Sequence, residues 1–214
     1  TVIFPADAWS LPRNETLLSQ NLRAAGYRTF ACGKWHLGLH KKWALPRQRG
    51  FDEQYGYYLG AVDYLTHARA GATGAVGTDW HRNESLAEID EIGSYSASLL
   101  AAAAVEFVSR NAEVPWFVYL AWQSVHAPLQ APDDCLARYP HLNGSQRVKA
   151  AMVCAMDDGV GNLTASLEAT GQMGRTLILF SADNGAPYKM VSWEGDAPES
   201  AVAAHTAGLG APRP

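Results

Sequence analysis

Apolar side chains along this chain follow two different periods, and their alternation predicts an α/β architecture. Three short runs rich in apolar residues are typical of buried central strands and occupy residues 27–32, 116–122 and 176–181, of which only the second is apolar throughout. Before each run lies a longer segment in which apolar residues recur every three to five positions, as in a helix with one buried face. These segments span residues 14–26, 94–111 and 146–169. A helix before every strand predicts a mostly parallel central sheet flanked by helices.

The regular pattern does not extend over the whole chain. Residues 41–93 contain many Gly, Tyr and Asp with little periodicity, which predicts long irregular segments with short elements. From residue 197 onward the chain consists mostly of Ala, Gly and Pro. We therefore expect one domain over residues 1–195, followed by a disordered tail over residues 196–214.

Composition narrows the class of protein. The chain has 214 residues, of which 48% are hydrophobic, and its formal net charge of −4 argues against a nucleic-acid-binding protein. It contains no apolar run long enough to span a membrane. The three cysteines allow at most one disulfide and lack metal-ligand spacing, so we interpret them as small hydrophobic core residues.

N-glycosylation sequons are more frequent than the composition predicts. About one would be expected by chance from the Asn, Ser and Thr content, but four occur, at Asn14, Asn83, Asn143 and Asn162. The excess favours a protein of the secretory pathway, with a lysosomal or extracellular location.

Residues that carry chemistry follow all three predicted strands. Lys34 and His36 come after the first strand, His126 after the second, and Asp183 with Asn184 after the third. Each has an ordinary alternative: a surface lysine, a half-buried histidine or an Asp-Asn-Gly turn. Because the carboxyl ends of parallel strands meet at one sheet edge, we expect these side chains to share a cleft.

The residue types indicate a particular reaction. A lysine supplies a point charge for a tetrahedral oxyanion, and two histidines can act as general base and general acid near neutral pH. Asp and Asn oxygens suit a hard cation such as Ca²⁺ or Mg²⁺. The set therefore predicts cation-assisted hydrolysis of an anionic ester, either a phosphate or a sulfate.

Several collinear stretches resemble the sulfatase family, specifically its arylsulfatase B branch. They are GYRTFACGKWHLG (26–38), RGFDEQYGYYLGAVDYLTH (49–67), PWFVYLAWQSVHAPLQAP (115–132), AAMVCAMDDGVGNLTASLEATG (150–171) and LILFSADNGA (177–186). The resemblance implies an alkaline-phosphatase-like α/β fold and an N-acetylgalactosamine-4-sulfatase of lysosomal or secreted type. The expected partner is a sulfated small molecule or glycan.

The resemblance also implies roles for individual residues. Lys34 resembles the family lysine that contacts sulfate and the nucleophile. His36 resembles the histidine that deprotonates the covalent intermediate, and His126 the histidine that assists the leaving group. All three are catalytic residues by this resemblance, and Lys34 and His126 also bind substrate.

The metal site and a second lysine are implied in the same way. Asp183 and Asn184 resemble two ligands of the family's Ca²⁺. Lys189, in KMVSWEG (189–195), resembles a further sulfate-binding lysine. A solvated loop lysine is an equal alternative for Lys189, because only four residues separate it from Asn184.

The chain departs from the family pattern at its most reactive position. The family nucleophile is a formylglycine made from the cysteine of Cys-x-Pro-Ser-Arg, and this motif is absent from the chain. We therefore expect an arylsulfatase fragment, incomplete at both ends and inactive alone. The main alternative is a non-catalytic remnant that binds sulfated glycans or a partner, and a weaker one is a phosphoesterase of the same superfamily.

Overall fold

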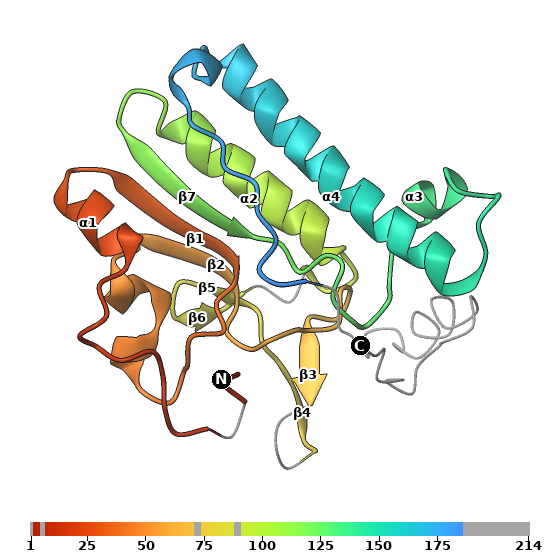
Figure 1. Ribbon diagram of the computed structural model, residues 1–214, viewed down its shortest axis with the longest axis horizontal. Helices are drawn as coiled ribbons and strands as arrows, with labels where there is room; N and C mark the ends of the chain where they lie inside the picture. The colour runs from red at the N-terminus through yellow and green to blue at the C-terminus, as the bar shows by residue number, and fades with distance from the viewer. Residues whose placement is uncertain (1, 5–6, 71–73, 88–90, 186–214) are drawn as a thin grey trace, which may run out of the picture.

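A computed structural model describes residues 2–4, 7–70, 74–87 and 91–185. Its centre is a five-stranded sheet in the order β6-β5-β2-β1-β7 (Figure 1). The strands are β1 (Arg28–Lys34), β2 (Glu53–Tyr57), β5 (His81–Arg82), β6 (Ser85–Leu86) and β7 (Trp116–Ala121). Strand β1 runs parallel to both β2 and β7, whereas the short β5 and β6 are antiparallel to their neighbours. The sheet is therefore mixed, with a parallel centre.

The described residues form four α-helices. They are α1 (Leu18–Ala24), α2 (Ser96–Arg110), α3 (Asp133–Ala137) and α4 (Gly144–Ala169). Helices α2 and α4 lie side by side along one side of the sheet, and α1 lies beside β1 at the other end (Figure 1). Short 3₁₀ turns, η1 (Lys42–Ala44), η2 (Pro46–Arg49) and η4 (Met173–Arg175), and a separate two-stranded sheet of β3 (Ala68–Ala70) and β4 (Val76–Thr78) complete the described elements.

The alternation of side chains along β1 explains why both faces of the sheet are covered. Phe30 and Cys32 belong to a core cluster that includes Leu100 and Phe107 of α2. The residue between them, Ala31, packs in a second cluster that Leu17 borders. The part of β1 that packs between these clusters is apolar, whereas Arg28 is exposed and the buried Thr29 donates its hydroxyl to the carbonyl of Gly50 at 2.9 Å. The expectation from the pattern of residues 27–32 is confirmed.

The boundaries of the predicted helices agree with the structure to different degrees. The second and third predicted helices correspond to α2 and α4, each within two residues at both ends. The first is shorter than expected, because α1 begins at Leu18 and Asn14 does not cap it. Instead, the side-chain oxygen of Gln20 accepts a hydrogen bond from the backbone N–H of Leu17 at 2.9 Å.

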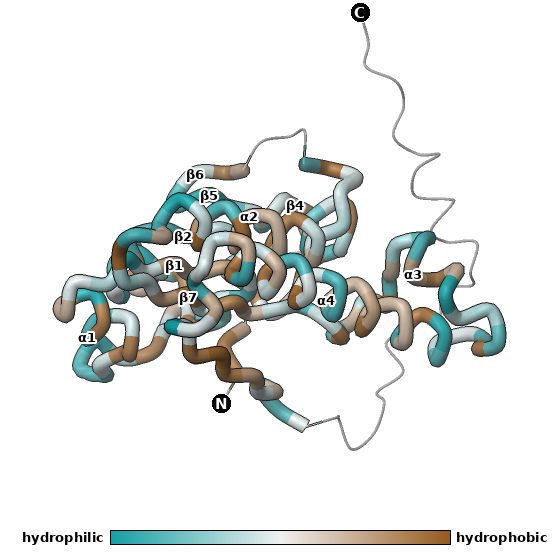
Figure 2. The backbone as a smooth tube through the Cα atoms, turned by 90° about the horizontal axis from the view of Figure 1, so that it is seen from above, coloured by the Kyte–Doolittle hydropathy of each residue, from teal (hydrophilic) through white to brown (hydrophobic). Residues whose placement is uncertain are grey.

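The expected third strand is not formed. Residues 176–181 follow η4 as irregular chain, and Leu177, Leu179 and Phe180 expose 82%, 84% and 76% of their surface. Figure 2 shows this apolar stretch as a brown segment beside β7, at the margin of the molecule. A strand needs a hydrogen-bonded neighbour, and within the described residues none pairs with this segment. An apolar run predicts burial, but it does not show that a neighbouring strand is present to pair with it.

The cysteines also differ from expectation. Cys135 of α3 and Cys154 of α4 form a disulfide, so the interpretation of these two as ordinary hydrophobic residues was wrong. Cys32 is a buried free thiol, as expected. The sequence allowed one disulfide but did not indicate which cysteines would meet, because that depends on how α3 packs on α4.

Two further expectations concern the ends of the chain and the membrane. Lys189 and the expected tail at residues 196–214 lie outside the described residues. Within the described part of the chain, no helix combines the length and the apolar character needed to cross a membrane.

Candidate active site at the end of β1

The chain leaves β1 at Lys34 and continues along β2 for two more residues. The backbone N–H of Trp35 donates to the carbonyl of Tyr57 at 3.0 Å, and that of His36 donates to Tyr58 at 3.0 Å. The Trp35 side chain is buried, and its indole N–H donates to the carbonyl of Ala44 at 3.0 Å. Trp35 therefore anchors the short turn that carries Lys34 and His36.

Two glycines make this arrangement sterically possible. Gly33 has a φ of 108°, and a Cβ there would lie 2.0 Å from the carbonyl oxygen of Ala121 on β7. Only glycine fits this left-handed conformation and this close approach between strands. At Gly60, a Cβ would lie 2.8 Å from Cε1 of His36. The space beside the imidazole thus depends on a missing side chain.

His36 is held in one orientation and one tautomer. It has a φ of 52°, which non-glycine residues adopt uncommonly, and its Nε2 lies 2.8 Å from the carbonyl oxygen of Ile3. A carbonyl can only accept, so Nε2 carries the proton and donates it, and Nδ1 is the basic nitrogen. Burial lowers the pKa of His36, and the Lys34, Arg69 and His126 charges lower it further, against the opposing effect of the Ile3 hydrogen bond. The imidazole is therefore neutral at pH 7.

Lys34 pairs with one of the residues expected to bind a metal. Its Nζ lies 3.7 Å from Oδ2 of Asp183, and the two side chains are 20% and 69% exposed. An ion pair this long and this open to solvent stabilises the fold little. The contact nevertheless shows that Asp183 lies beside the end of β1.

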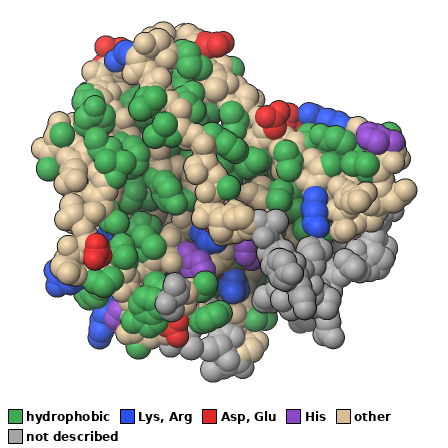
Figure 3. All heavy atoms as spheres, in the orientation of Figure 1, with side chains coloured by type: hydrophobic (Ala, Val, Ile, Leu, Met, Phe, Trp, Pro, Cys, Tyr) green, Lys and Arg blue, Asp and Glu red, His purple; other side chains and the backbone are tan. Residues whose placement is uncertain are grey.

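His126 lies on the exposed turn after β7. Its Nδ1 donates to the carbonyl of Ala127 at 2.7 Å, and its own carbonyl accepts a hydrogen bond from the Tyr64 hydroxyl at 3.0 Å. The charge of His126 acts on the pKa of His36, so the two imidazoles lie within electrostatic range of each other. Figure 3 shows histidine and Lys or Arg side chains gathered on one face of the molecule.

The structure adds two residues that the sequence did not single out. Arg69 is close enough to lower the pKa of His36. Tyr57, the last residue of β2 and the register partner of Lys34, has a buried hydroxyl that contacts no hydrogen-bond partner within the described residues. Burial, followed by the Asp79 and Asp183 charges, raises the pKa of Tyr57. Tyr57 becomes the neighbour of Lys34 only through the pairing of β1 with β2, and Arg69 lies in the aperiodic segment, so the sequence pattern carried a signal for neither.

The described residues do not complete a calcium site. Asp183 and Asn184 offer two side-chain oxygens, whereas Ca²⁺ takes about six to eight ligands. The Asn184 amide nitrogen donates to the carbonyl of Gly185 at 2.9 Å, which leaves its oxygen available. The Asp79 carboxylate accepts hydrogen bonds from the backbone N–H groups of Tyr58 and Leu59, at 3.0 and 2.8 Å, so both of its oxygens are already bound to the backbone.

Two cavities adjoin these elements. The smaller, of about 260 Å³, lies beside His36 and is lined mostly by apolar residues near the N-terminus, such as Ile3 and Trp9. The larger, of about 450 Å³, lies between α2, α3 and α4 and contains none of the residues described above. Size alone therefore does not identify the site. The charged groups at the end of β1 do.

The expected glycosylation sites differ in accessibility. Asn14, Asn143 and Asn162 are exposed, and Asn162 lies within α4. Asn83 is half-buried, with its side-chain oxygen accepting the backbone N–H of Gln54 at 3.1 Å. An exposed loop suits a glycan acceptor better than a helix interior or an engaged amide.

Comparison with known proteins agrees with the fold and with these motifs. The family model described as Sulfatase matches residues 1–206, and the chain belongs to the sulfatase family. It is 35% identical to arylsulfatase J of Mus musculus over 187 residues, covering 86% of this chain and 31% of that protein. It is 30% identical to N-acetylgalactosamine-6-sulfatase of Homo sapiens, covering 82% of this chain and 34% of that protein.

A solved structure shares the architecture. The crystal structure of Ps i-CgsB matches with a TM-score of 0.70 and 30% identity, over 80% of this chain and 40% of that one. The same protein was solved in complex with k-i-k-neocarrahexaose. The chain thus spans about a third of the length of arylsulfatase J and of N-acetylgalactosamine-6-sulfatase. The matches support the sulfatase family, but they do not select the arylsulfatase B branch that the sequence motifs suggested.

Proposed function

We propose that this chain is the central part of a sulfuric ester hydrolase, with Lys34, His36 and His126 as its contribution to the active site. The observation that carries the proposal is the grouping at the end of β1, where Lys34 pairs with Asp183 and its charge and that of His126 act on His36. A lysine, a neutral histidine and a second histidine within electrostatic range of one another suit an anionic ester.

Each residue has a distinct chemical task in this proposal. The Lys34 ammonium holds a sulfate oxygen and stabilises the negative charge that grows in the transition state. His36 accepts a proton at Nδ1, since its Nε2 is committed to the Ile3 carbonyl. His126 is exposed on its turn and donates a proton toward the leaving ester oxygen.

Two parts of the proposed active site, the cation site and the nucleophile, are incomplete among the described residues. Asp183 and Asn184 supply two oxygens to a divalent cation, proposed to be Ca²⁺, whose further ligands are not among the described residues. When bound, the cation neutralises charge on the sulfate. The formylglycine precursor Cys-x-Pro-Ser-Arg is absent from the chain, and we therefore propose that the chain alone is inactive.

The substrate class proposed is a sulfated sugar. The printed names of the relatives include N-acetylgalactosamine-6-sulfatase, and Ps i-CgsB was solved with an oligosaccharide. An N-acetylgalactosamine 4-sulfate remains a specific proposal from the sequence motifs. A location in the secretory pathway is proposed from the exposed sequons and from the Cys135–Cys154 disulfide, which persists in oxidising compartments.

Hydrolysis of a chromogenic aryl sulfate tests the proposal. The chain alone should not release the aryl alcohol, whereas a longer protein that adds an activated Cys-x-Pro-Ser-Arg segment and a complete C-terminal region should. In that protein, Lys34→Ala should lower kcat by about 10²–10³ and His36→Ala by about 10²–10⁴. Exposed His141, on the loop before α4, provides the control: His141→Ala should leave kcat unchanged.

The alternative of a non-catalytic binder gives a different result. It predicts that the longer protein binds a sulfated oligosaccharide without releasing sulfate, and that Lys34→Ala weakens binding only. Equal losses of kcat for His36→Ala and His141→Ala would show that the turn after β1 has a structural role and no part in the chemistry.

A further inference from the structure

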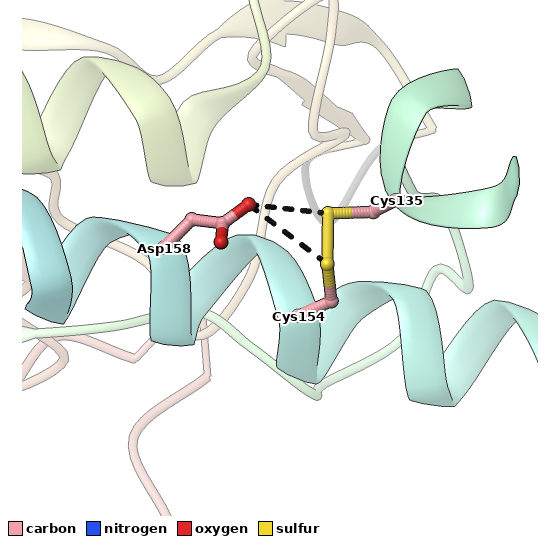
Figure 4. A group of neighbouring side chains, drawn as sticks. All are labelled: Cys135, Cys154 and Asp158. Atoms are coloured by element: carbon pink, nitrogen blue, oxygen red, sulfur yellow. Dashed lines mark hydrogen bonds between the residues drawn. A yellow bond between two sulfur atoms is a disulfide. The ribbon is translucent and has the colours of Figure 1, made fainter. Parts of the chain in front are cut away.

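Two sulfurs and a carboxylate meet between α3 and α4, in a cluster that shares no residue with the candidate active site. Cys154 and Asp158 are four residues apart on α4, so they lie on the same face of that helix. Cys135 reaches them from α3 (Figure 4). One ligand atom from each residue lies within 4.8 Å of the other two. Within the described residues, this is the group of at least three His, Cys, Asp or Glu side chains close enough together to hold a metal ion.

The distances in this cluster suit tetrahedral coordination. Oδ2 of Asp158 lies 3.7 Å from Sγ of Cys135 and 3.9 Å from Sγ of Cys154. With Zn–S bonds of about 2.3 Å and a Zn–O bond of about 2.0 Å, a tetrahedral site separates sulfur from oxygen by about 3.5 Å. The carboxylate is therefore close to ligand position for both sulfurs. Only the sulfurs must separate, to about 3.8 Å, once their mutual bond is broken.

The disulfide does not explain the position of Asp158. A disulfide sulfur has no hydrogen to donate, so the oxidised cluster gives the carboxylate no hydrogen bond from either cysteine. Arg138 holds it instead, with Nη1 at 3.0 Å from Oδ1 and Nη2 at 2.8 Å from Oδ2. Two thiolates and one carboxylate carry three negative charges. A divalent cation together with the Arg138 guanidinium would neutralise them.

The cluster is both sheltered and accessible. Cys135 and Cys154 expose 1% and 6% of their surface, whereas the Asp158 side chain is 42% exposed. Cys135 and Asp158 line the cavity of about 450 Å³, together with Ser98 and Val105 of α2. A water molecule has room there to serve as a fourth ligand, and an ion has a route to the sulfurs.

We propose that the dithiol form of this cluster binds Zn²⁺ through Cys135, Cys154 and Asp158. The dithiol exists before the disulfide forms, or after a dithiol reductant has transferred two electrons and two protons to the disulfide. One Zn²⁺ ion then displaces the two thiol protons and takes both thiolates, the carboxylate and a water. Exchange with a disulfide oxidant, which accepts the two electrons and leaves as a dithiol, re-forms the Cys135–Cys154 disulfide and releases the ion. The disulfide and the metal are mutually exclusive occupants of the same contact between α3 and α4.

Cobalt titration tests the proposal directly, because Co²⁺ bound to thiolates has charge-transfer absorption that unbound Co²⁺ lacks. The chain is reduced with dithiothreitol, freed of reductant under anaerobic conditions and titrated with Co²⁺. One equivalent should saturate the absorption, and one equivalent of Zn²⁺ should abolish it. The oxidised chain should show no such absorption. A reduced chain that gives none would overturn the proposal.

Variants then assign the ligands. Cys154→Ala should abolish the absorption, whereas Cys32→Ala, which removes the buried thiol of β1, should leave it intact. Asp158→Asn should weaken Zn²⁺ binding at least about tenfold. Asp157→Asn is the matched control on the adjacent exposed residue and should change affinity by less than about twofold. Equal affinities for Asp158→Asn and Asp157→Asn would overturn the assignment of Asp158.

Urea unfolding distinguishes a site in the folded protein from thiols of the unfolded chain. Zn²⁺ should raise the unfolding midpoint of the reduced wild-type chain and leave that of reduced Cys154→Ala unchanged. If the reduced chain is unfolded, Zn²⁺ should restore its native circular dichroism. A midpoint that falls on adding Zn²⁺, or a spectrum that does not recover, would mean that the ion prefers the unfolded chain and would contradict the proposal.

Discussion

A Cβ atom on Gly60 would lie 2.8 Å from Cε1 of His36 and 3.1 Å from its Nε2. The position of the imidazole is therefore set by two residues from different segments: Gly60, which leaves space, and Ile3, whose carbonyl accepts the Nε2 hydrogen at 2.8 Å. The lowered pKa of His36 depends on this position, because burial is its largest cause.

Gly60→Ala should displace the His36 ring from this position. The new methyl group cannot occupy the same space as the imidazole, so the ring should move toward solvent and lose its bond to Ile3. Its pKa should then rise toward the ordinary value of about 6.5. Histidine NMR signals followed through a pH titration provide the measurement.

Gly161→Ala is the control for this change. Gly161 lies in α4, and a Cβ there would meet nothing within 4 Å. This substitution should leave the His36 titration unchanged and increase the free energy of unfolding by up to about 1 kcal/mol, because alanine favours the helix. An unchanged His36 pKa in Gly60→Ala would contradict the steric argument.

Stability should fall as the pH is lowered below the ordinary histidine pKa. Burial lowers the pKa of His67, which is 1% exposed, stacks on Trp80 at 4.4 Å and donates from Nε2 to the carbonyl of Ser94. Its folded-state pKa lies below the unfolded value, so the unfolded state binds more protons between the two. The contribution to stability is complete above about pH 6.5 and is lost as pH falls through the folded pKa. His36 acts in the same direction.

Urea unfolding at about pH 7.5 and about pH 5 measures this loss. His67→Asn should reduce the difference between the two pH values, and asparagine tolerates the φ of 55° at this position. His141→Asn changes an exposed side chain and should leave the difference as it is in the wild type. A wild-type chain that is more stable at the lower pH would contradict the assigned sign.

The regular elements were predictable, because each has a period long enough to recognise. The apolar face of residues 146–169 predicted α4 to within two residues, and the uninterrupted run at residues 116–122 predicted β7. Strands β5 and β6 have two residues each and show no period at all. Strand β2 mixes Glu53 and Gln54 with aromatic residues, so its pairing with β1 was not predictable from the pattern.

The candidate site was predictable in its members but not in its geometry. The motif around Lys34 and His36 indicated chemistry at the end of a strand, and the structure places that motif at the end of β1. The sequence could not show that His36 has a φ of 52° or that Ile3 binds its ring. Both depend on contacts between segments that are far apart in the chain.

Asp79 should prove important for stability, because it supports the loop that carries Gly60. Its carboxylate accepts the backbone N–H groups of Tyr58 and Leu59, and Nε2 of His81 lies 3.0 Å from it. Asp79→Ala leaves two backbone donors without an acceptor, which should cost about 2–4 kcal/mol of unfolding free energy.

Hydrogen exchange localises this effect. In Asp79→Ala, the amides of Tyr58 and Leu59 should exchange faster than the loss of global stability explains. The exchange of the α4 amides should follow the global unfolding free energy alone. Asp157→Ala on the exposed surface of α4 should change neither measurement. If both variants lose the same stability, the two hydrogen bonds of Asp79 have no particular role.

The segment at residues 176–181 allows a direct test of sequence pattern against structure. In the structure, Leu179 and Phe180 expose 84% and 76% of their surface. Leu179→Ser and Phe180→Ser should therefore change the unfolding free energy by less than about 0.5 kcal/mol and should reduce self-association at high concentration.

Leu167, which is 1% exposed in the core between α2 and α4, provides the comparison. Leu167→Ser should cost about 3–5 kcal/mol, because it removes apolar packing and buries a hydroxyl. Neighbouring positions on a strand point to opposite faces, so a buried strand would make at least one of the two serine variants as costly as Leu167→Ser. That result, measured by urea unfolding, would contradict the exposed segment and support the strand that the sequence pattern predicted.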